Sequence, residues 1–304
     1  MAQQRRKLWI GIGTSVLLGT SGAAAAESAP EQPTTHGSEH LLLAAAGGEG
    51  GEGGEGGEGG GNPMSVFADG GEGGEGGEGG EGGEGSGSAA AATDSPGVYY
   101  SQLAFMLGHM KVARELYEAG DTATGATHLG HPAAEHLAAV EEALAQRGQD
   151  EVATRVRALA ETAGDGVTWS EIADQYETTQ SAIRAAMSEV AADRLHDPAL
   201  LARVTVAIAL KARQEYAAAI EDGRFVNAHE YQDARGFLQV GREMLERHAD
   251  TLREADADAY ADLVQRFEDL MAAWPSVQPP SEPVLSISAL YGRVSALEFA
   301  ANRF

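Results

Sequence analysis

The sequence contains no cysteine. Disulfide bonds, a thiol nucleophile, thiolate metal ligands and the lipid-modified cysteine of a lipoprotein are therefore all excluded. Basic residues are also few, because 21 lysines and arginines stand against 46 aspartates and glutamates, for a formal net charge of −25. This balance disfavours nucleic acid and anionic lipid as partners, and it suits cations or basic surfaces. Without cross-links, the folded part must be stabilised by its apolar core.

The N-terminal residues have the three parts of a secretory signal. Basic residues 5–7 precede an apolar run at 8–18, and alanines at 24–26 supply the small residues of a cleavage site. A membrane anchor is the alternative, but the apolar run is shorter than the ~20 residues that span a bilayer. We therefore expect residues 1–26 to be a signal peptide, by the general or the twin-arginine route. The mature chain is then periplasmic or secreted in a bacterial cell envelope, with no membrane span.

Residues 27–95 are dominated by Gly-Gly-Glu repeats, in one run at 49–58 and a second at 72–84. Glycine is costly to order, and repeated glutamates repel one another without offering apolar surface to bury. We expect a disordered, solvated acidic tether. A weak cation collector is the sharper alternative, because carboxylates on a flexible chain bind hard cations without preorganisation. Leucines 41–43 and the Val66-Phe67 pair are candidate docking points.

From residue 98 onward, apolar residues recur with helical spacing, and this predicts an all-α fold. Caps and breaks mark the helix ends: Thr168 and Glu171 form a capping box, and Pro198 follows Asp197 at a helix start. About eight helices are expected, at 98–118, from the 120–121 break to 147, and at 150–162, 168–195, 197–221, 227–249, 256–274 and 286–301.

Short motifs recur in the same order about one hundred residues apart. This recurrence predicts duplicated four-helix-bundle repeats at residues 96–196 and 197–304. The offset between the copies grows along the chain, as loop insertions would cause. The paired motifs are 114–117 with 213–216, 120–121 with 222–223, 126–128 with 227–229, Trp169 with Trp274, and Tyr176 with Tyr291.

The first copy holds the strongest candidate site. His128, His131 and Glu135 are spaced i, i+3 and i+7, which places them on one stripe of a continuous helix. Two imidazoles and a carboxylate suit iron, zinc or copper. His109 is the expected third histidine if the first two helices form a hairpin, whereas His136 is expected to point into solvent. The alternative is that these histidines cap helices or line an interhelical seam.

Two further groups are weaker candidates. In the second copy, His229 and Glu230 are either ligands or part of a structural corner, in which Asp233 and Arg235 form an ion pair or interhelical contacts. Met106 and Met110 flank His109 and would suit monovalent copper, but methionines at helical spacing also fill cores. The chain has no nucleophile elbow, no His-Glu-x-x-His motif and no phosphate-binding loop.

Two segments carry a family resemblance. Residues 227–237, NAHEYQDARGF, resemble the periplasmic extensions of bacterial iron permeases and the related imelysin-like proteins, and residues 108–136 are similar to the first-copy counterpart. The resemblance implies an exported α-helical bundle, often duplicated, that takes part in iron or copper uptake. Imelysin-like proteins carry Gly-x-His-x-x-Glu, whereas here Gly130 adjoins His131, and Glu135 follows four residues later. We transfer no catalytic role from the family.

The sequence therefore predicts an exported, non-enzymatic metal-binding or metal-uptake accessory protein, with iron or copper as the ion. Its expected partners are a metal cation and a membrane permease or another envelope protein. The first alternative is a tethered helical interaction or scaffold module, whose imidazoles would lie more than a coordination sphere apart. A metal-dependent oxidoreductase is the second alternative, and it requires an open coordination position.

Overall fold

The computed structural model describes residues 62–67, 92–189 and 196–304. The predicted signal peptide and both Gly-Gly-Glu runs lie outside these residues. The described elements are η1 (Pro63–Phe67), α2 (Pro96–Glu118), α3 (Thr122–His131), η2 (Pro132–His136), α4 (Leu137–Gln146), α5 (Asp150–Gly164), α6 (Trp169–Glu189), α7 (Pro198–Ala218), β1 (Ile220–Glu221), β2 (Arg224–Phe225), α8 (Ala228–Arg247), α9 (Ala249–Ala255), α10 (Ala257–Met271) and α11 (Ile287–Ala301).

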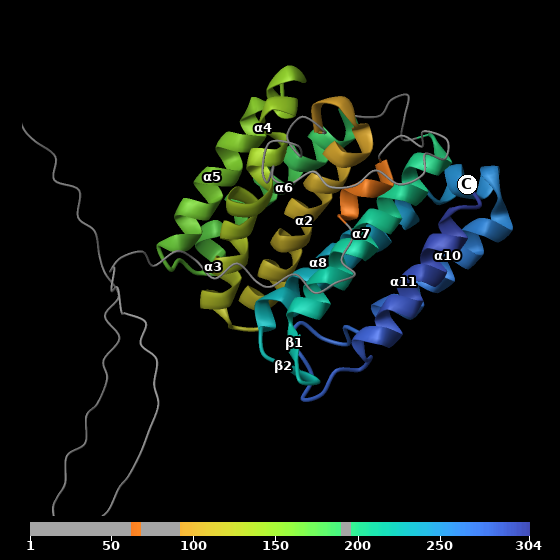
Figure 1. Cartoon of the computed structure of the whole chain (residues 1–304). Helices are drawn as coiled ribbons and strands as arrows, with labels where there is room; N and C mark the ends of the chain where they lie inside the picture. Colours follow the sequence, from red (N-terminus) through yellow and green to blue (C-terminus); the bar gives the residue numbers. More distant parts are fainter. Residues whose placement is uncertain (1–61, 68–91, 190–195) are drawn as a thin grey trace, which may run out of the picture. The chain divides into compact units, whose positions relative to one another are not determined.

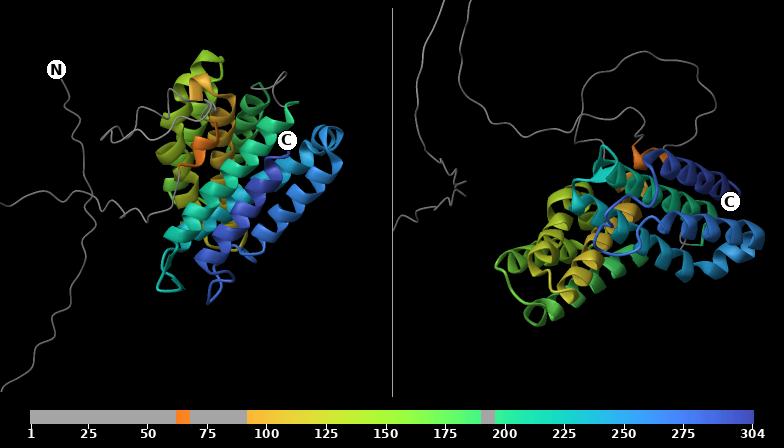
Figure 2. Two further views of the ribbon diagram at one scale, coloured as in Figure 1. Left: turned by 45° about the vertical axis from the view of Figure 1, so that its right-hand side comes forward. Right: turned by 90° about the horizontal axis from the view of Figure 1, so that it is seen from below.

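The predicted all-α fold is confirmed. Helices α2, α7 and α8 pack on one another at the centre, with α3 to α6 on one side and α10 and α11 on the other (Figures 1 and 2). The described residues form ten α-helices instead of about eight, because the second predicted helix is divided by η2 and a short α9 follows α8. Within the described ranges, no helix is both long and apolar enough to cross a membrane.

Local capping signals set the helix starts. Ser95 accepts a hydrogen bond from the Val98 N–H and precedes Pro96 at the start of α2. The predicted capping box opens α6, since Glu171 accepts from the Thr168 N–H at 2.8 Å. Asp197 likewise caps α7 ahead of its proline. Helix α2 is buried along most of its length, because neighbouring helices cover it on several sides.

One predicted helix end is wrong. The helix expected to reach residue 221 stops at Ala218, and a small antiparallel hairpin of β1 and β2 follows. Both turn residues have positive φ, 48° for Asp222 and 74° for Gly223. An Asp-Gly pair with positive φ at both positions is the typical two-residue hairpin turn, and its local preference overrides continuation of the helix.

A π-helical segment, η2, separates α3 from α4. The Leu137 N–H bonds to the carbonyl of Pro132, five residues earlier. Pro132 has no N–H of its own, so the regular i→i−4 ladder is already interrupted there. The wider turn moves the following side chains away from their ideal α-helical directions. His136 is consequently buried, and the expectation that it points into solvent is wrong.

Helices α2 and α8 cross at two glycines, Gly108 and Gly236. A Cβ atom on Gly236 would overlap the carbonyl oxygen of Gly108 and lie 2.8 Å from its carbonyl carbon. A Cβ on Gly108 would lie 2.9 Å from the backbone nitrogen of Phe237. The two backbones therefore touch directly. This close crossing brings the next residue of α2, His109, within reach of α8.

The two halves use corresponding aromatic contacts. Trp169 packs on Tyr117 with ring centroids 5.7 Å apart, and Trp274 packs on Tyr216 at 4.9 Å. These are the tryptophans and tyrosines that the repeated motifs pair with one another. Each pair joins the C-terminal end of a central helix to residues about fifty positions later in the same half. The duplication itself stays a prediction.

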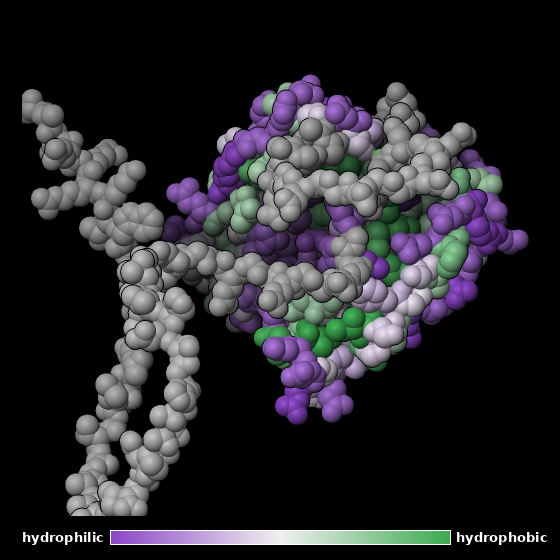
Figure 3. Space-filling model, viewed as in Figure 1, coloured by the Kyte–Doolittle hydropathy of each residue, from purple (hydrophilic) through white to green (hydrophobic). Residues whose placement is uncertain are grey.

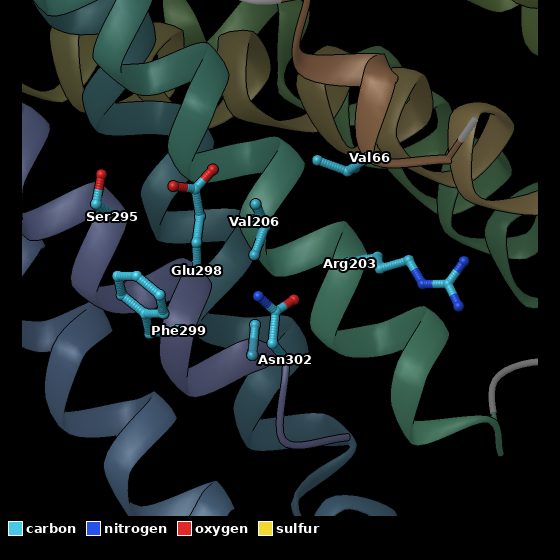
Figure 4. A pocket seen from close by; sticks show the side chains of 8 residues that line it. Val66, Arg203, Val206, Ser295, Glu298, Phe299 and Asn302 are labelled. Atoms are coloured by element: carbon cyan, nitrogen blue, oxygen red, sulfur yellow. The ribbon is translucent and has the colours of Figure 1, made fainter. Parts of the chain in front are cut away.

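The segment expected to be an unfolded tether contains an ordered part. Residues Pro63–Phe67 form the 3-10 helix η1, whose Met64, Val66 and Phe67 pack against the core. The Phe67 ring lies so close to Gly97 that an added Cβ would overlap it. Val66 lines a pocket together with Val206 and Phe299 (Figure 4). The Val66-Phe67 pair therefore docks, because it supplies apolar surface that the repeats lack.

Candidate metal centre

Three imidazoles converge on one carboxylate where α3 faces α2 and α8. Nδ1 of His109 lies 2.6 Å from Oδ1 of Asp233, and Nδ1 of His128 lies 2.8 Å from the same oxygen. Nδ1 of His131 lies 3.2 Å from Oδ2. One ligand atom from each of the four residues fits within 4.8 Å of the other three. His109 comes from α2, His128 and His131 from α3, and Asp233 from α8.

The cluster is buried, with an opening at one side. His109 and His128 are fully buried and Asp233 is nearly so. The His131 side chain is 18% exposed, and that of Glu135 is 41% exposed. Figure 3 shows hydrophilic residues in a recess between the α3 side and the α7 side of the bundle. His131 and Glu135 therefore form the solvent-facing edge of the cluster.

Hydrogen bonds hold the far sides of the two buried histidines, His109 and His128. Nε2 of His128 lies 2.8 Å from Oε1 of Gln232. Nε2 of His109 lies 2.9 Å from Nε2 of His136, whose Nδ1 is in turn 2.8 Å from Oε1 of Gln102. An amide oxygen accepts and never donates, so Nε2 of His128 carries the proton. Its Nδ1 is then the atom that faces Asp233, and a proton or an ion between the two would be shared with the carboxylate.

The electrostatics of the site follow from this packing. Burial acts to raise the pKa of Asp233, but the surrounding imidazoles of His109, His128 and His131 outweigh it and hold that pKa far below its usual range. Burial alone would lower the pKa of His131, whereas its hydrogen bond to Asp233 and the nearby carboxylates raise it. Burial, followed by the proximity of His109, holds the pKa of His136 well below its ordinary value. Asp233 is thus an anion at the centre of the cluster.

Glu135 lies beside the four-residue cluster, near its opening. Its Oε1 is 3.5 Å from Nδ1 of His131, and its Oε2 is 3.6 Å from Nε2 of His109. It also forms a second group of potential ligands with His109 and His136. The expected stripe of His131 and Glu135 is therefore present, but Glu135 faces the outer edge of the site.

The weaker candidates, His229 and Glu230, lie next to the cluster. The His229 ring centroid is 5.4 Å from that of His128, and burial together with His128 lowers the pKa of His229. A hydrogen bond to Glu215 and burial raise the pKa of Glu230 to about 8. Glu215 also forms an ion pair with Lys211. His229 and Glu230 thus border the cluster without joining its inner ligand set.

Sequence reasoning missed Asp233 as a site residue. Of the two roles expected for Asp233 and Arg235, the ion pair between them is wrong, and the interhelical contacts are present. Arg235 pairs with Glu115 at 3.0 Å and donates to the Trp274 carbonyl at 2.7 Å, while Asp233 binds the histidines. The available signal was its position one turn before Phe237, on the face of α8 that also buries Val240 and Met244. A carboxylate on an apolar face requires buried hydrogen-bond donors or cations as partners.

The donor set fits a transition-metal ion. Three imidazole nitrogens and one carboxylate oxygen match the ligand types and number of a tetrahedral zinc site, and they also suit copper and iron. A tetrahedral ion with bonds of about 2.1 Å holds its ligand atoms roughly 3.3 Å apart. The distances from the three nitrogens to the Asp233 oxygens, 2.6, 2.8 and 3.2 Å, are shorter, so the nitrogens must move away from the carboxylate by roughly 0.1–0.7 Å to admit an ion. Met106 and Met110 are fully buried in the core.

Comparisons with known proteins point to one family. Residues 191–302 match the family model of the iron permease-associated 4-helix bundle domain. No curated protein matches the chain. No solved structure matches it either. The match supports the iron permease part of the expected resemblance and not its imelysin-like part. The matched residues include Asp233 but none of the three clustered histidines, so the C-terminal part of this chain is similar to iron permease-associated bundles.

Proposed function

We propose that this protein is an exported, non-enzymatic accessory of metal uptake that binds an iron or copper ion. The ion is held by His109, His128, His131 and Asp233. Glu135 at the opening is the first carboxylate to meet it. The partner that receives or supplies the ion is a membrane permease of the cell envelope.

One observation carries the proposal: a buried carboxylate faces imidazole nitrogens whose opposite sides are already hydrogen-bonded. With its Nε2–H donated to Gln232, His128 has only Nδ1 to face Asp233, at 2.8 Å. A lone pair and an anion repel at this distance unless a cation lies between them. A proton or a metal ion can serve, and the convergence of a third imidazole, that of His131, favours an ion with several coordination positions.

Three further observations support this function. Residues 191–302 match a domain that is named for its association with iron permeases. The formal net charge of −25 attracts cations to the surface. The ligand atoms lie within 4.8 Å of one another, whereas the scaffold alternative expects imidazoles more than a coordination sphere apart. No separate observation favours the oxidoreductase alternative.

The exposure of each residue determines the order in which it contacts the ion. His131 and Glu135 are the exposed groups, so they exchange water for the arriving ion first. Asp233 then supplies the negative charge that offsets the cost of removing the ion from water. His109 and His128, fixed by their partners behind, complete the shell and exclude solvent. Protons held at Nδ1 leave as the ion binds, so affinity depends on pH.

Isothermal titration calorimetry with Fe²⁺ under anaerobic conditions, Cu²⁺ and Zn²⁺ tests the proposal. Asp233→Asn removes the central charge with little change of shape, and we expect a loss of affinity of at least about tenfold. Asp250→Asn is the matched control, because the Asp250 side chain is 98% exposed. Equal affinities for the two variants, or no heat with any of the three ions, would contradict the proposed site.

The pH dependence separates this site from the glutamate repeats. Imidazoles with ordinary pKa values near 6.5 protonate below about pH 6 and then cannot ligate. We therefore expect the affinity to fall between about pH 7 and 5. The same affinity at pH 5 would assign binding to the glutamates, whose ordinary pKa is near 4.3.

A further inference from the structure

Two residues behind His109 continue the network away from the ligand cluster. Nε2 of His109 lies 2.9 Å from Nε2 of His136, and Nδ1 of His136 lies 2.8 Å from Oε1 of Gln102. His109 and His136 are buried, and Gln102 is 9% exposed. Neither His136 nor Gln102 offers an atom to the group formed by the three histidines and Asp233. Their position calls for a role other than direct ligation in that group.

The direction of these hydrogen bonds follows from Gln102, the last acceptor in the series. The amide oxygen of Gln102 accepts, so Nδ1 of His136 carries a proton and donates it. A neutral His136 then has a lone pair on Nε2. The neighbouring Nε2 of His109 must therefore be the donor of the 2.9 Å hydrogen bond. His109 is left with Nδ1, the nitrogen nearest Asp233, as its remaining coordinating atom.

We propose that Gln102 and His136 are positioning residues that fix the tautomer of His109 and so direct its Nδ1 toward the bound ion. The inference rests on the proposed function, since it assigns how one ligand of that site is prepared. Metal-bound histidines commonly donate their other N–H to a fixed acceptor, which sets ring orientation and basicity. Here the acceptor is a second histidine, and the amide sets the direction of both hydrogen bonds.

The surroundings protect the two hydrogen bonds that join His109 to His136 and His136 to Gln102, which we call the relay. The Phe105 ring centroid is 5.4 Å from that of His136, and the Phe237 ring packs edge-on against His109 at 4.9 Å. These rings exclude water, so no solvent molecule replaces a lost acceptor at low cost. The π-helical turn of η2 is what brings His136 into this pocket. The relay thus depends on the π-helical segment η2, which carries His136.

Zn²⁺ titration of the full chain tests the relay. Gln102→Leu removes the acceptor at similar volume, and we expect a 10- to 100-fold loss of Zn²⁺ affinity. Gln102→Glu keeps an acceptor oxygen and should stay within a few-fold of the unchanged chain. Gln180→Leu is the matched control, because Gln180 hydrogen-bonds to Tyr176 on α6, away from the cluster. Equal affinities for the two leucine variants would overturn the relay.

The stoichiometry and the imidazole protons provide independent readouts. We expect one Zn²⁺ per chain, whereas two ions, with the second lost in His136→Phe, would mean that His109 and His136 bind metal with Nε2 instead. Long-range ¹H–¹⁵N NMR of the metal-free chain should show His136 protonated on Nδ1 and His109 on Nε2. Failure of the unchanged chain to bind Zn²⁺ would count against the proposed function, and these spectra would still decide the relay. A proton on Nε2 of His136 would refute it.

Discussion

Replacing Gly236 by alanine tests how the crossing of α2 and α8 positions the candidate metal centre. The new Cβ would overlap the carbonyl oxygen of Gly108 and lie 2.8 Å from its carbonyl carbon, whereas ordinary contact begins at 3.4 Å. These are backbone atoms that cannot rotate away, so the helices must separate by at least about 0.6 Å. Inserting such a group into a packed interface costs about 1–3 kcal/mol, which exceeds the ~1 kcal/mol that alanine gains over glycine in a helix.

The same separation should loosen the ligand cluster. Metal sites tolerate deviations of only about ±0.2 Å in ligand distance, and His109 and Asp233 belong to the two helices that would move apart. We therefore expect Gly236→Ala to lower both the unfolding free energy, by about 1–2 kcal/mol net, and the affinity for Zn²⁺. Urea denaturation followed by circular dichroism measures the first effect, and calorimetry measures the second.

Gly292→Ala is the matched control for this change. Gly292 lies within α11, and a Cβ there would meet nothing within 4 Å. Only the gain in helix propensity remains, so this variant should be more stable than the unchanged chain by up to about 1 kcal/mol. If Gly236→Ala were as stable as Gly292→Ala and bound Zn²⁺ normally, the direct backbone contact would not control the site.

Three other perturbations address separate features. Phe67→Ala should lower the unfolding free energy by about 1–2 kcal/mol in a urea titration, because the partly buried ring packs over Gly97. This loss is smaller than for a fully buried phenylalanine. Phe299→Ala is the control and should not change the unfolding free energy, because that side chain is 77% exposed. The raised pKa of Glu230, about 8 against an ordinary 4.5, stabilises the fold most below pH 4.5, and this contribution is lost as the pH rises through 8. The melting temperature of the metal-free chain should therefore fall between pH 4.5 and 8, relative to that of Glu230→Gln. The same pH dependence in both proteins would refute the assignment. Arg235→Lys cannot serve both Glu115 and the Trp274 carbonyl, so it should cost about 1–2 kcal/mol. Arg155→Lys, at an exposed pair with Glu151, should cost nearly nothing.

The sequence predicts those parts of the fold that depend on neighbouring residues. The capping box of Thr168 and Glu171 and the Asp197-Pro198 start lie within one helical turn, so their effect is local. The clustering of His109, His128 and His131 was also predictable, because a short break between two amphipathic helices favours a hairpin. These inferences required no knowledge of contacts between distant residues.

His136 and Asp233 could not be placed in this way. A regular turn of 3.6 residues directs His136 about 100° away from Glu135, but the π-helical turn at Pro132 changes that direction. Asp233 is 124 residues from His109 in the sequence, and its burial depends on the contact of Gly108 with Gly236. Helical periodicity gives the face of a helix but not the helix that covers it, so long-range partners stay undetermined.

The division of the ligands between the two halves has a mechanical consequence for a chain without cysteine. His109 and Asp233 are separated by 124 residues, so an ion bound by both would close a loop of that length. Closing a loop of about 100 residues with a covalent cross-link removes chain entropy worth roughly 4–5 kcal/mol from the unfolded state. A bound ion would act as a reversible cross-link of this kind, formed on loading and opened on release. Resistance to proteolysis and to unfolding would then follow the supply of metal.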